Sequence, residues 1–317
     1  MAPEDWMHRH VLVLSGLLLA ALALPGGSAL ADDLSACTAN APTALSQRIA
    51  SCSRAIASDR APAAAYLARG QAYRMKADYG DAIEDFDAVI DMDAAPALTA
   101  EALLGRGAAF AARGKLRKAI ADLGRALDIG LPPGRQAAAY YYRGLAHADA
   151  GDFDQSVADF DAAIRLGFTS ARAYGYRGSA NAARGDYDLA IRDYDTAIRL
   201  DRRGAHYFAG RCWAMGKTEQ FDRALADCTR AIELDAGLSA GYEGRALALE
   251  STGSIAAAEK DYRRALKLDP TSQTARDGLK RLASVEAEPA STSKLVKKVA
   301  VPGQAGTGEL IRRNRKP

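Results

Sequence analysis

Apolar and small residues recur every three to four positions along most of this 317-residue chain, with polar residues between them. This period is typical of amphipathic α-helices. The pattern itself repeats every 34 residues when the chain is aligned on its Arg-Gly dipeptides. Insertions of three residues, 97–99 and 134–136, follow the first two units. The six units are 63–96, 100–133, 137–170, 171–204, 205–238 and 239–272.

Each unit predicts a pair of helices, at about positions 2–14 and 17–30 of the unit. Positions 8 and 20 are small in every unit, and position 24 is large except for one cysteine. Small residues let the two helix axes approach closely. A single hairpin cannot cover its own apolar faces, so we expect the hairpins to stack into an all-α solenoid. Glycine stands at the predicted turn, where left-handed backbone costs it nothing, in four units: Gly114, Gly151, Gly185 and Gly253.

Stretches such as ARGDYDLAIRDYDTAIRLD combine a small turn residue, an aromatic, alanines and a terminal Leu-Asp. This pattern resembles the tetratricopeptide repeat family over residues 63–272. The resemblance implies a right-handed superhelical solenoid of helix-turn-helix repeats. Residues 48–57 align with the second helix of a unit, so residues 32–62 are expected to form a partial N-terminal repeat. Residues 273–284 are expected to form a capping helix with Lys280 and Arg281 outward.

Arginine occupies position 7 and aspartate position 23 in all six units. One interpretation is a row of arginines that bind a ligand. The favoured interpretation is a structural ladder of Arg–Asp pairs between helices, because the planar guanidinium matches a carboxylate. The pairs are Arg69 and Asp85, Arg106 and Asp122, Arg143 and Asp159, Arg177 and Asp193, Arg211 and Asp227, and Arg245 and Asp261.

The resemblance also implies a concave groove for peptide segments of partner proteins, lined by positions 2, 5, 6, 9, 12 and 13. The middle units place at these positions Tyr141, Tyr142, Leu145, Arg172, Tyr176, Ser179, His206, Trp213 and Lys217. The first units place there Leu67, Gln71, Arg74, Met75 and Leu104. The family's clamp for a partner's terminal carboxylates is missing, because position 6 lacks its polar residues. Rigid aromatics suit an extended apolar peptide, although some of these side chains could instead pack against neighbouring units.

Residues 1–31 predict a cleaved export signal, with an apolar run at 11–24 and small residues before a cleavage point after Ala31. An uncleaved anchor and a lipid-modified Cys37 are the alternatives. Residues 285–317 carry seven Lys or Arg and three Glu without helical periodicity, so we expect a disordered basic tail, with weak contact to an anionic envelope as a rival role. Residues 32–284 are neutral overall, which argues against nucleic-acid binding.

Four cysteines remain to be placed. Cys212 and Cys228 take positions 8 and 24 of one unit, which face each other in the other units, so we expect a disulfide inside the hairpin. Cys37 and Cys52 suggest a second bridge of the same kind in the partial repeat. An exported protein would keep both oxidised. Zinc binding would require distant units to converge, and a reactive thiol pair is the other alternative.

No catalytic, metal or cofactor constellation emerges from the sequence. Only His147 and His206 remain after the predicted signal, in different units, and the glycines follow the repeat. We therefore expect no enzyme activity and no cofactor. The leading hypothesis is an exported scaffold or adaptor, in a bacterial periplasm, that binds protein partners during envelope assembly or secretion. The alternative is a structural component that self-assembles through the solenoid ends or the tail.

Overall fold

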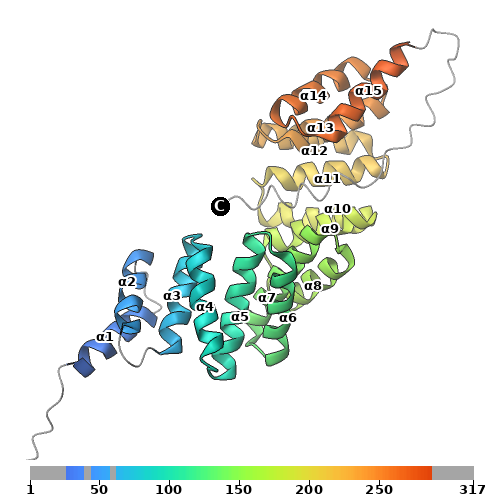
Figure 1. Cartoon of the computed structure of the whole chain (residues 1–317). Coiled ribbons are helices and arrows are strands. Elements are labelled where there is room, and N and C mark those ends of the chain that lie inside the picture. The colour runs from blue at the N-terminus through green and yellow to red at the C-terminus, as the bar shows by residue number, and fades with distance from the viewer. Residues whose placement is uncertain (1–25, 39–43, 58–61, 288–317) are drawn as a thin grey trace, which may run out of the picture.

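The computed structural model describes residues 26–38, 44–57 and 62–287. These residues form fifteen α-helices and no strand, and successive helices pack against one another along the sequence. Figure 1 shows a curved stack with α1 and α2 at one end and α14 and α15 at the other. The all-α solenoid predicted from the repeat is confirmed. Its helices are α1 (Gly26–Thr38), α2 (Leu45–Ile56), α3 (Ala63–Met75), α4 (Tyr79–Asp91), α5 (Pro96–Ala112), α6 (Leu116–Ile129), α7 (Pro133–Ala150), α8 (Phe153–Arg165), α9 (Ala171–Arg184), α10 (Tyr187–Leu200), α11 (Ala205–Lys217), α12 (Phe221–Leu234), α13 (Ser239–Ser251), α14 (Ile255–Leu268) and α15 (Gln273–Ala287).

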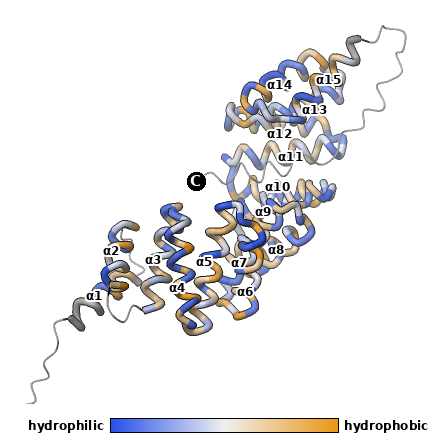
Figure 2. Tube along the Cα trace, in the orientation of Figure 1, coloured by the Kyte–Doolittle hydropathy of each residue, from blue (hydrophilic) through white to orange (hydrophobic). Residues whose placement is uncertain are grey.

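The first helices of the hairpins line one side of the stack. Each odd-numbered helix from α3 to α13 contacts the next odd-numbered helix, whereas the even-numbered helices of the described residues make no comparable contacts with one another. The odd-numbered helices are therefore closer together and form the concave face, and the even-numbered helices form the convex face. Figure 2 shows hydrophobic and hydrophilic residues interspersed along these helices, which fits elements covered on one side only.

The two insertions lengthen helices instead of forming loops. α5 has 17 residues and α7 has 18, whereas α3 has 13. Each long helix starts at a proline, Pro96 or Pro133, at a position where the missing N–H has no partner to lose. The two long helices are joined near their starts, because Arg135 of α7 forms an ion pair with Glu101 of α5.

The turn inside each hairpin has a left-handed residue at position 15 of the unit. Gly114, Gly151, Gly185 and Gly253 have φ values of 70°, 88°, 90° and 80°, as the sequence predicts. The same conformation is imposed on Ala77 and Glu219, with φ of 65° and 59°. A Cβ is strained there, so the fold and not the residue decides the turn in these two units.

Large side chains at position 24 of one unit fill the space beside position 6 of the next. A Cβ added at Gly105 would lie 2.4 Å from Phe86, and one at Gly210 would lie 2.5 Å from Tyr194. Where position 6 carries a ring instead, as at Tyr176, that ring stacks on Phe160 of the preceding unit with centroids 6.1 Å apart. Position 6 therefore belongs to the contact between neighbouring repeats.

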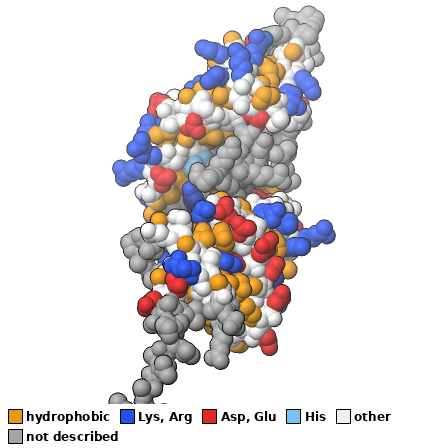
Figure 3. All heavy atoms as spheres, turned by 60° about the vertical axis from the view of Figure 1, so that its left-hand side comes forward, with side chains coloured by type: hydrophobic (Ala, Val, Ile, Leu, Met, Phe, Trp, Pro, Cys, Tyr) orange, Lys and Arg blue, Asp and Glu red, His pale blue; other side chains and the backbone are white. Residues whose placement is uncertain are grey.

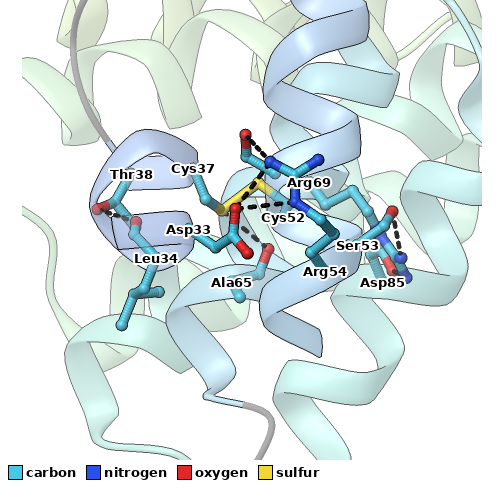
Figure 4. The surroundings of a disulfide bond; sticks show 11 residues. Asp33, Leu34, Cys37, Thr38, Cys52, Ser53, Arg54, Ala65, Arg69 and Asp85 are labelled. Carbon is cyan, nitrogen blue, oxygen red and sulfur yellow. Dashed lines mark hydrogen bonds and ion pairs between the residues drawn. A yellow bond between two sulfur atoms is a disulfide. The ribbon is translucent and has the colours of Figure 1, made fainter. Parts of the chain in front are cut away.

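The N-terminal hairpin is formed by α1 and α2 and held by a disulfide (Figure 4). Arg54 of α2 pairs with Asp33 of α1, and Arg69 of α3 donates to the hydroxyl of Ser53. Residues 1–25 of the predicted export signal lie outside the described residues. Helix α1 starts at Gly26 and runs through the predicted cleavage point after Ala31.

The last helix, α15, covers the other end of the stack and continues past the predicted end at residue 284. Ala275 and Leu282 are buried, and Lys280 is 75% exposed, in line with a cap. The expected outward orientation of Arg281 is wrong, because its guanidinium bonds to Glu250 of α13 and to the Tyr262 hydroxyl of α14. Residues 288–317 of the predicted tail lie outside the described residues.

Candidate peptide groove and the arginine ladder

Each position-7 arginine donates two or more hydrogen bonds to the position-23 aspartate of its own hairpin. The aspartates are nearly buried, with side chains 5–12% exposed, and the arginines are 17–25% exposed. Repeat geometry explains the match, since positions 7 and 23 face each other across the hairpin. The bonded pairs are Arg69–Asp85, Arg106–Asp122, Arg143–Asp159, Arg177–Asp193, Arg211–Asp227 and Arg245–Asp261.

The third nitrogen, Nη1, reaches back to position 25 of the preceding repeat. Arg106 bonds to Asp87 at 2.6 Å, and Arg177 bonds to Asp161 at 2.5 Å. Arg211 bonds to Asp195 at 2.5 Å. Two arginines meet no carboxylate there, because position 25 of the preceding unit holds Gly124 before Arg143 and Thr229 before Arg245.

The environment fixes the charge of these pairs. Hydrogen bonds with Asp122 and Asp87 raise the pKa of Arg106, which is the direction expected for a guanidinium between two carboxylates. Burial raises the pKa of the Asp193 carboxyl, and the hydrogen bonds from Arg177 and Asn181 oppose that rise. The arginine donors are therefore occupied by protein carboxylates, which is the geometry of a structural ladder.

Two disulfides lie in the interior. Cys37 is joined to Cys52, and Cys212 to Cys228, and all four residues are at most 1% exposed. The second bridge replaces the glycine and ring found at positions 8 and 24 of the preceding unit. Gly244 makes room for it, because a Cβ there would lie 2.6 Å from the Cys228 sulfur.

Four of the side chains assigned to the groove lie mainly in the core. Tyr141, Leu145, Tyr176 and Ser179 are 8%, 6%, 4% and 4% exposed. The ring of Tyr141 packs on Phe168, with centroids 4.5 Å apart, and the Ser179 hydroxyl pairs with that of Tyr194. Their exposed surface is therefore small, and these two contacts are made within their own repeats.

The first units contribute unevenly to the concave face. Leu67 and Leu104 are 9% and 3% exposed, whereas Met75 is 62% exposed. Arg74 lies over the ring of Tyr142, 5.9 Å from its centroid, so side chains of α3 and α7 meet above the small residues of α5. Gln71 is half-buried on α3.

Four accessible members of the predicted groove, Arg172, His206, Trp213 and Lys217, line two hollows that share α11. The first, which we term the polar hollow, is a shallow depression lined by Arg172, Gly175, Tyr176, His206 and Tyr207. The second, the aromatic hollow, is also shallow, and its lining includes Trp213, Lys217, Phe221, Leu247 and Ser251. The side chain of Lys217 lies over the Trp213 ring, with Nζ 4.9 Å from the centroid.

The polar hollow holds one exposed cation beside a neutral histidine. Burial lowers the pKa of His206 to about 4, with a smaller opposing effect from Asp201. Burial also lowers the pKa of Lys217 in the aromatic hollow. Arg172 is exposed at the edge of the polar hollow. Each hollow thus offers a cation and an aromatic surface. Along α11 the two hollows are separated by the seven residues from His206 to Trp213, or about 10 Å.

A family model of the tetratricopeptide repeat matches residues 67–135, 104–167, 141–205, 177–238 and 214–273. The chain belongs to the tetratricopeptide repeat (TPR) family. No curated protein sequence matches it at a significant level.

Solved TPR structures share the fold at low sequence identity. The crystal structure of the APC/C hetero-tetramer Cut9-Hcn1 is 18% identical with a TM-score of 0.60, covering 80% of this chain and 52% of that one. The chain therefore spans about half the length of that relative. YrrB, described as a TPR protein with an unusual peptide-binding site, is 16% identical with a TM-score of 0.50, covering 62% of this chain and 99% of YrrB. A TPR protein from Parabacteroides merdae is 20% identical with a TM-score of 0.51, covering 75% and 92%.

Sequence reasoning missed two features of this TPR solenoid. The first is the role of position 25, although its aspartates Asp87, Asp161 and Asp195 recur with the repeat and could have signalled it. The second is the lining of the aromatic hollow: Leu247 takes groove position 9 of the last unit, so the repeat could have signalled it, whereas Phe221 at position 17 has no such signal. Among the described residues there is no group of His, Cys, Asp and Glu arranged to hold a metal ion, and no helix long and apolar enough to span a membrane.

Proposed function

We propose that this chain is an adaptor that binds an extended peptide segment of a protein partner against α9, α11 and α13. The observation that carries the proposal is the pair of hollows on neighbouring first helices, one polar and one aromatic. Solenoids of helical repeats use their concave surfaces for binding. YrrB, which shares the fold, is described as having a peptide-binding site.

Within the set assigned from the sequence, we assign the contacts with the peptide to Arg172, His206, Trp213 and Lys217. Trp213 supplies a large rigid surface at the mouth of the aromatic hollow, and such residues dominate interface energies. Tyr141, Leu145 and Ser179 support the groove from within, Tyr176 forms part of the wall of the polar hollow, and the half-buried Tyr142 contacts Arg74 outside both hollows. The function requires no catalysis and no cofactor.

The test is peptide selection on the full chain, followed by affinity measurement for single variants. Trp213→Ala and Arg172→Ala are expected to weaken binding of a selected peptide at least tenfold. Arg230→Ala, on the convex face and 50% exposed, is the matched control and should bind as the parent does. Equal affinity of the parent and both groove variants would place the peptide elsewhere and contradict the assignment.

We further propose that the adaptor acts after export, in a bacterial periplasm, during envelope assembly or secretion. The apolar segment at 11–24, the small residues before Asp32 and two interior disulfides support this location. Mass spectrometry of the protein from its native cell should give a mature chain that starts at Asp32 and has four oxidised cysteines. An intact N-terminus with reduced cysteines would contradict export.

A further inference from the structure

The convex surface of the last repeat carries a row of basic side chains. Lys260, Arg263, Arg264 and Lys267 stand three and four residues apart on α14, so they lie on one helix face. All four are exposed, and we term them the α14 stripe. Figure 3 shows Lys and Arg side chains gathered at this end of the solenoid.

No other repeat has this arrangement at the same four positions, which are 22, 25, 26 and 29 of the unit. The equivalent residues of α4 are acidic at three of the four, with Glu84, Asp87 and Asp91. In the four helices between, acidic and basic residues mix: α6 has Arg125 and Asp128, for example. The convex face therefore changes from acidic at the first repeat to basic at the last.

The cations of the α14 stripe are only partly engaged within the protein. Arg263 pairs with Glu259 on the same helix while remaining 68% exposed, and Arg264 lies 5.7 Å from the centroid of the Tyr242 ring. Lys260 and Lys267 form no ion pair within the described part of the chain. By contrast, two aspartates of α4 are used inside the fold, Asp85 by Arg69 and Asp87 by Arg106.

We propose that the α14 stripe docks the solenoid onto an anionic lipid bilayer. The four charges extend along about 10 Å of an exposed convex helix, which suits a flat negative surface. Lys280 lies at the same end of the molecule on the adjoining α15, 75% exposed and 3.7 Å from Asp277 of its own helix. The acidic α4 in the first repeat offers no such attraction, so the last repeat is the part of the solenoid that contacts the bilayer.

Nucleic acid is the less favoured polyanion. The stripe is a single short row on a convex surface, with no groove to follow a phosphate backbone, and residues 32–284 are neutral overall. The docking site is separate from the peptide groove, because it lies on an even-numbered helix at the convex side. It does not depend on the groove having a ligand.

The test is co-sedimentation of the full chain with vesicles of phosphatidylcholine alone or of phosphatidylcholine and phosphatidylglycerol in a 3:1 ratio. The parent should bind the anionic vesicles at least tenfold more tightly, and 0.5 M salt should remove the difference. The variant K260Q/R263Q/R264Q/K267Q should lose at least tenfold of this affinity. A chain in which the seven basic residues of 285–317 are changed to Gln should still bind the anionic vesicles. The remaining affinity should fall when the four residues of the α14 stripe are also changed to Gln.

The matched control is R125Q/R165Q/R192Q/R199Q, which removes the same charge from exposed convex positions of α6, α8 and α10. This control should bind anionic vesicles within twofold of the parent. Binding through the apolar segment at 11–24 would be the same for all chains and both vesicles. Equal binding by the stripe and control variants would overturn the proposal, as would tighter, stripe-dependent binding to a DNA duplex than to the anionic vesicles.

Discussion

Arg177 connects Asp193 and Asp161, which lie on the second helices of two successive repeats. Its Nε and Nη2 donate to Asp193 of its own hairpin, and its Nη1 donates to Asp161 of the hairpin before. One side chain therefore links α8, α9 and α10. The ring of Tyr174 lies 5.5 Å from the same guanidinium, so an apolar surface supports the charge.

Removing the inner carboxylate of this link should be costly. Asp193→Ala leaves Arg177 and Asn181 without their buried partner, and we expect a loss of about 3 kcal/mol in the free energy of unfolding, measured in urea. Glu233→Ala breaks the exposed pair of Arg230 and Glu233 and should cost less than 0.5 kcal/mol. Similar small losses for both variants would show that the ladder contributes little to stability.

Restoring a missing link should stabilise the stack. Thr229 occupies position 25 before Arg245, where three other units have an aspartate bonded to the following arginine. Thr229→Asp should raise the free energy of unfolding by about 0.5 to 1 kcal/mol, because the guanidinium gains a charged acceptor. The uncharged Thr229→Asn is the control, and an equal gain in both variants would exclude an ion pair as the cause.

Relieving a strained turn should stabilise the protein. Ala77→Gly relieves a left-handed alanine with φ of 65°, and we expect about 1 kcal/mol of added stability. Gly185→Ala imposes the same strain and should lose about 1 kcal/mol, which thermal unfolding can follow. Ala88→Gly, inside α4, should instead destabilise by up to about 1 kcal/mol. A loss of stability in Ala77→Gly would contradict the role of the turn.

The second disulfide can be replaced by the packing of its neighbour. Reduction of Cys212–Cys228 opens a loop of 16 residues and should cost about 3 kcal/mol. The double variant C212G/C228Y copies Gly178 and Tyr194, and Gly244 leaves room for the ring, as Gly210 does for Tyr194. Its loss on adding reductant should be about 3 kcal/mol smaller than in the parent. Equal sensitivity would assign the reductant effect to Cys37–Cys52.

Acid should destabilise the protein through His206. Its pKa is about 4 in the folded chain, against an ordinary 6.5, so the unfolded state binds the proton first as the pH falls. The contribution of the neutral His206 to the free energy of unfolding is fully present above pH 6.5. As the pH falls from 6.5 to 4, this contribution declines by about 3 kcal/mol. Urea unfolding of His206→Gln should lack this part of the slope. An unchanged slope would mean that other groups control the acid limb.

The sequence predicts much of this fold because each repeat encodes its own hairpin. The period, the turn glycines and the facing of positions 8 and 24 are local, and the structure has them where expected. The partial repeat with Cys37 and Cys52 follows from the same register.

Contacts between repeats were harder to predict. The ring of Phe160 reaches position 6 of the next unit and covers Tyr176, a residue assigned to the groove. Contacts of this kind depend on how two neighbouring hairpins are rotated against each other. The 34-residue period of the sequence does not determine that rotation. No structure was assigned from the sequence to the two insertions, which lengthen α5 and α7 from their starts at Pro96 and Pro133.

A gap in the arginine links should mark a boundary between cooperatively unfolding parts of the solenoid. A repeat protein unfolds according to the strength of each nearest-neighbour interface. The interfaces at Gly124 with Arg143 and at Thr229 with Arg245 lack the arginine link found at the other three, but Arg135 and Glu101 form an ion pair across the first of them. Local unfolding should therefore pause at the second boundary, so that the last repeat and its cap can open and close as a unit while the repeats before them stay folded.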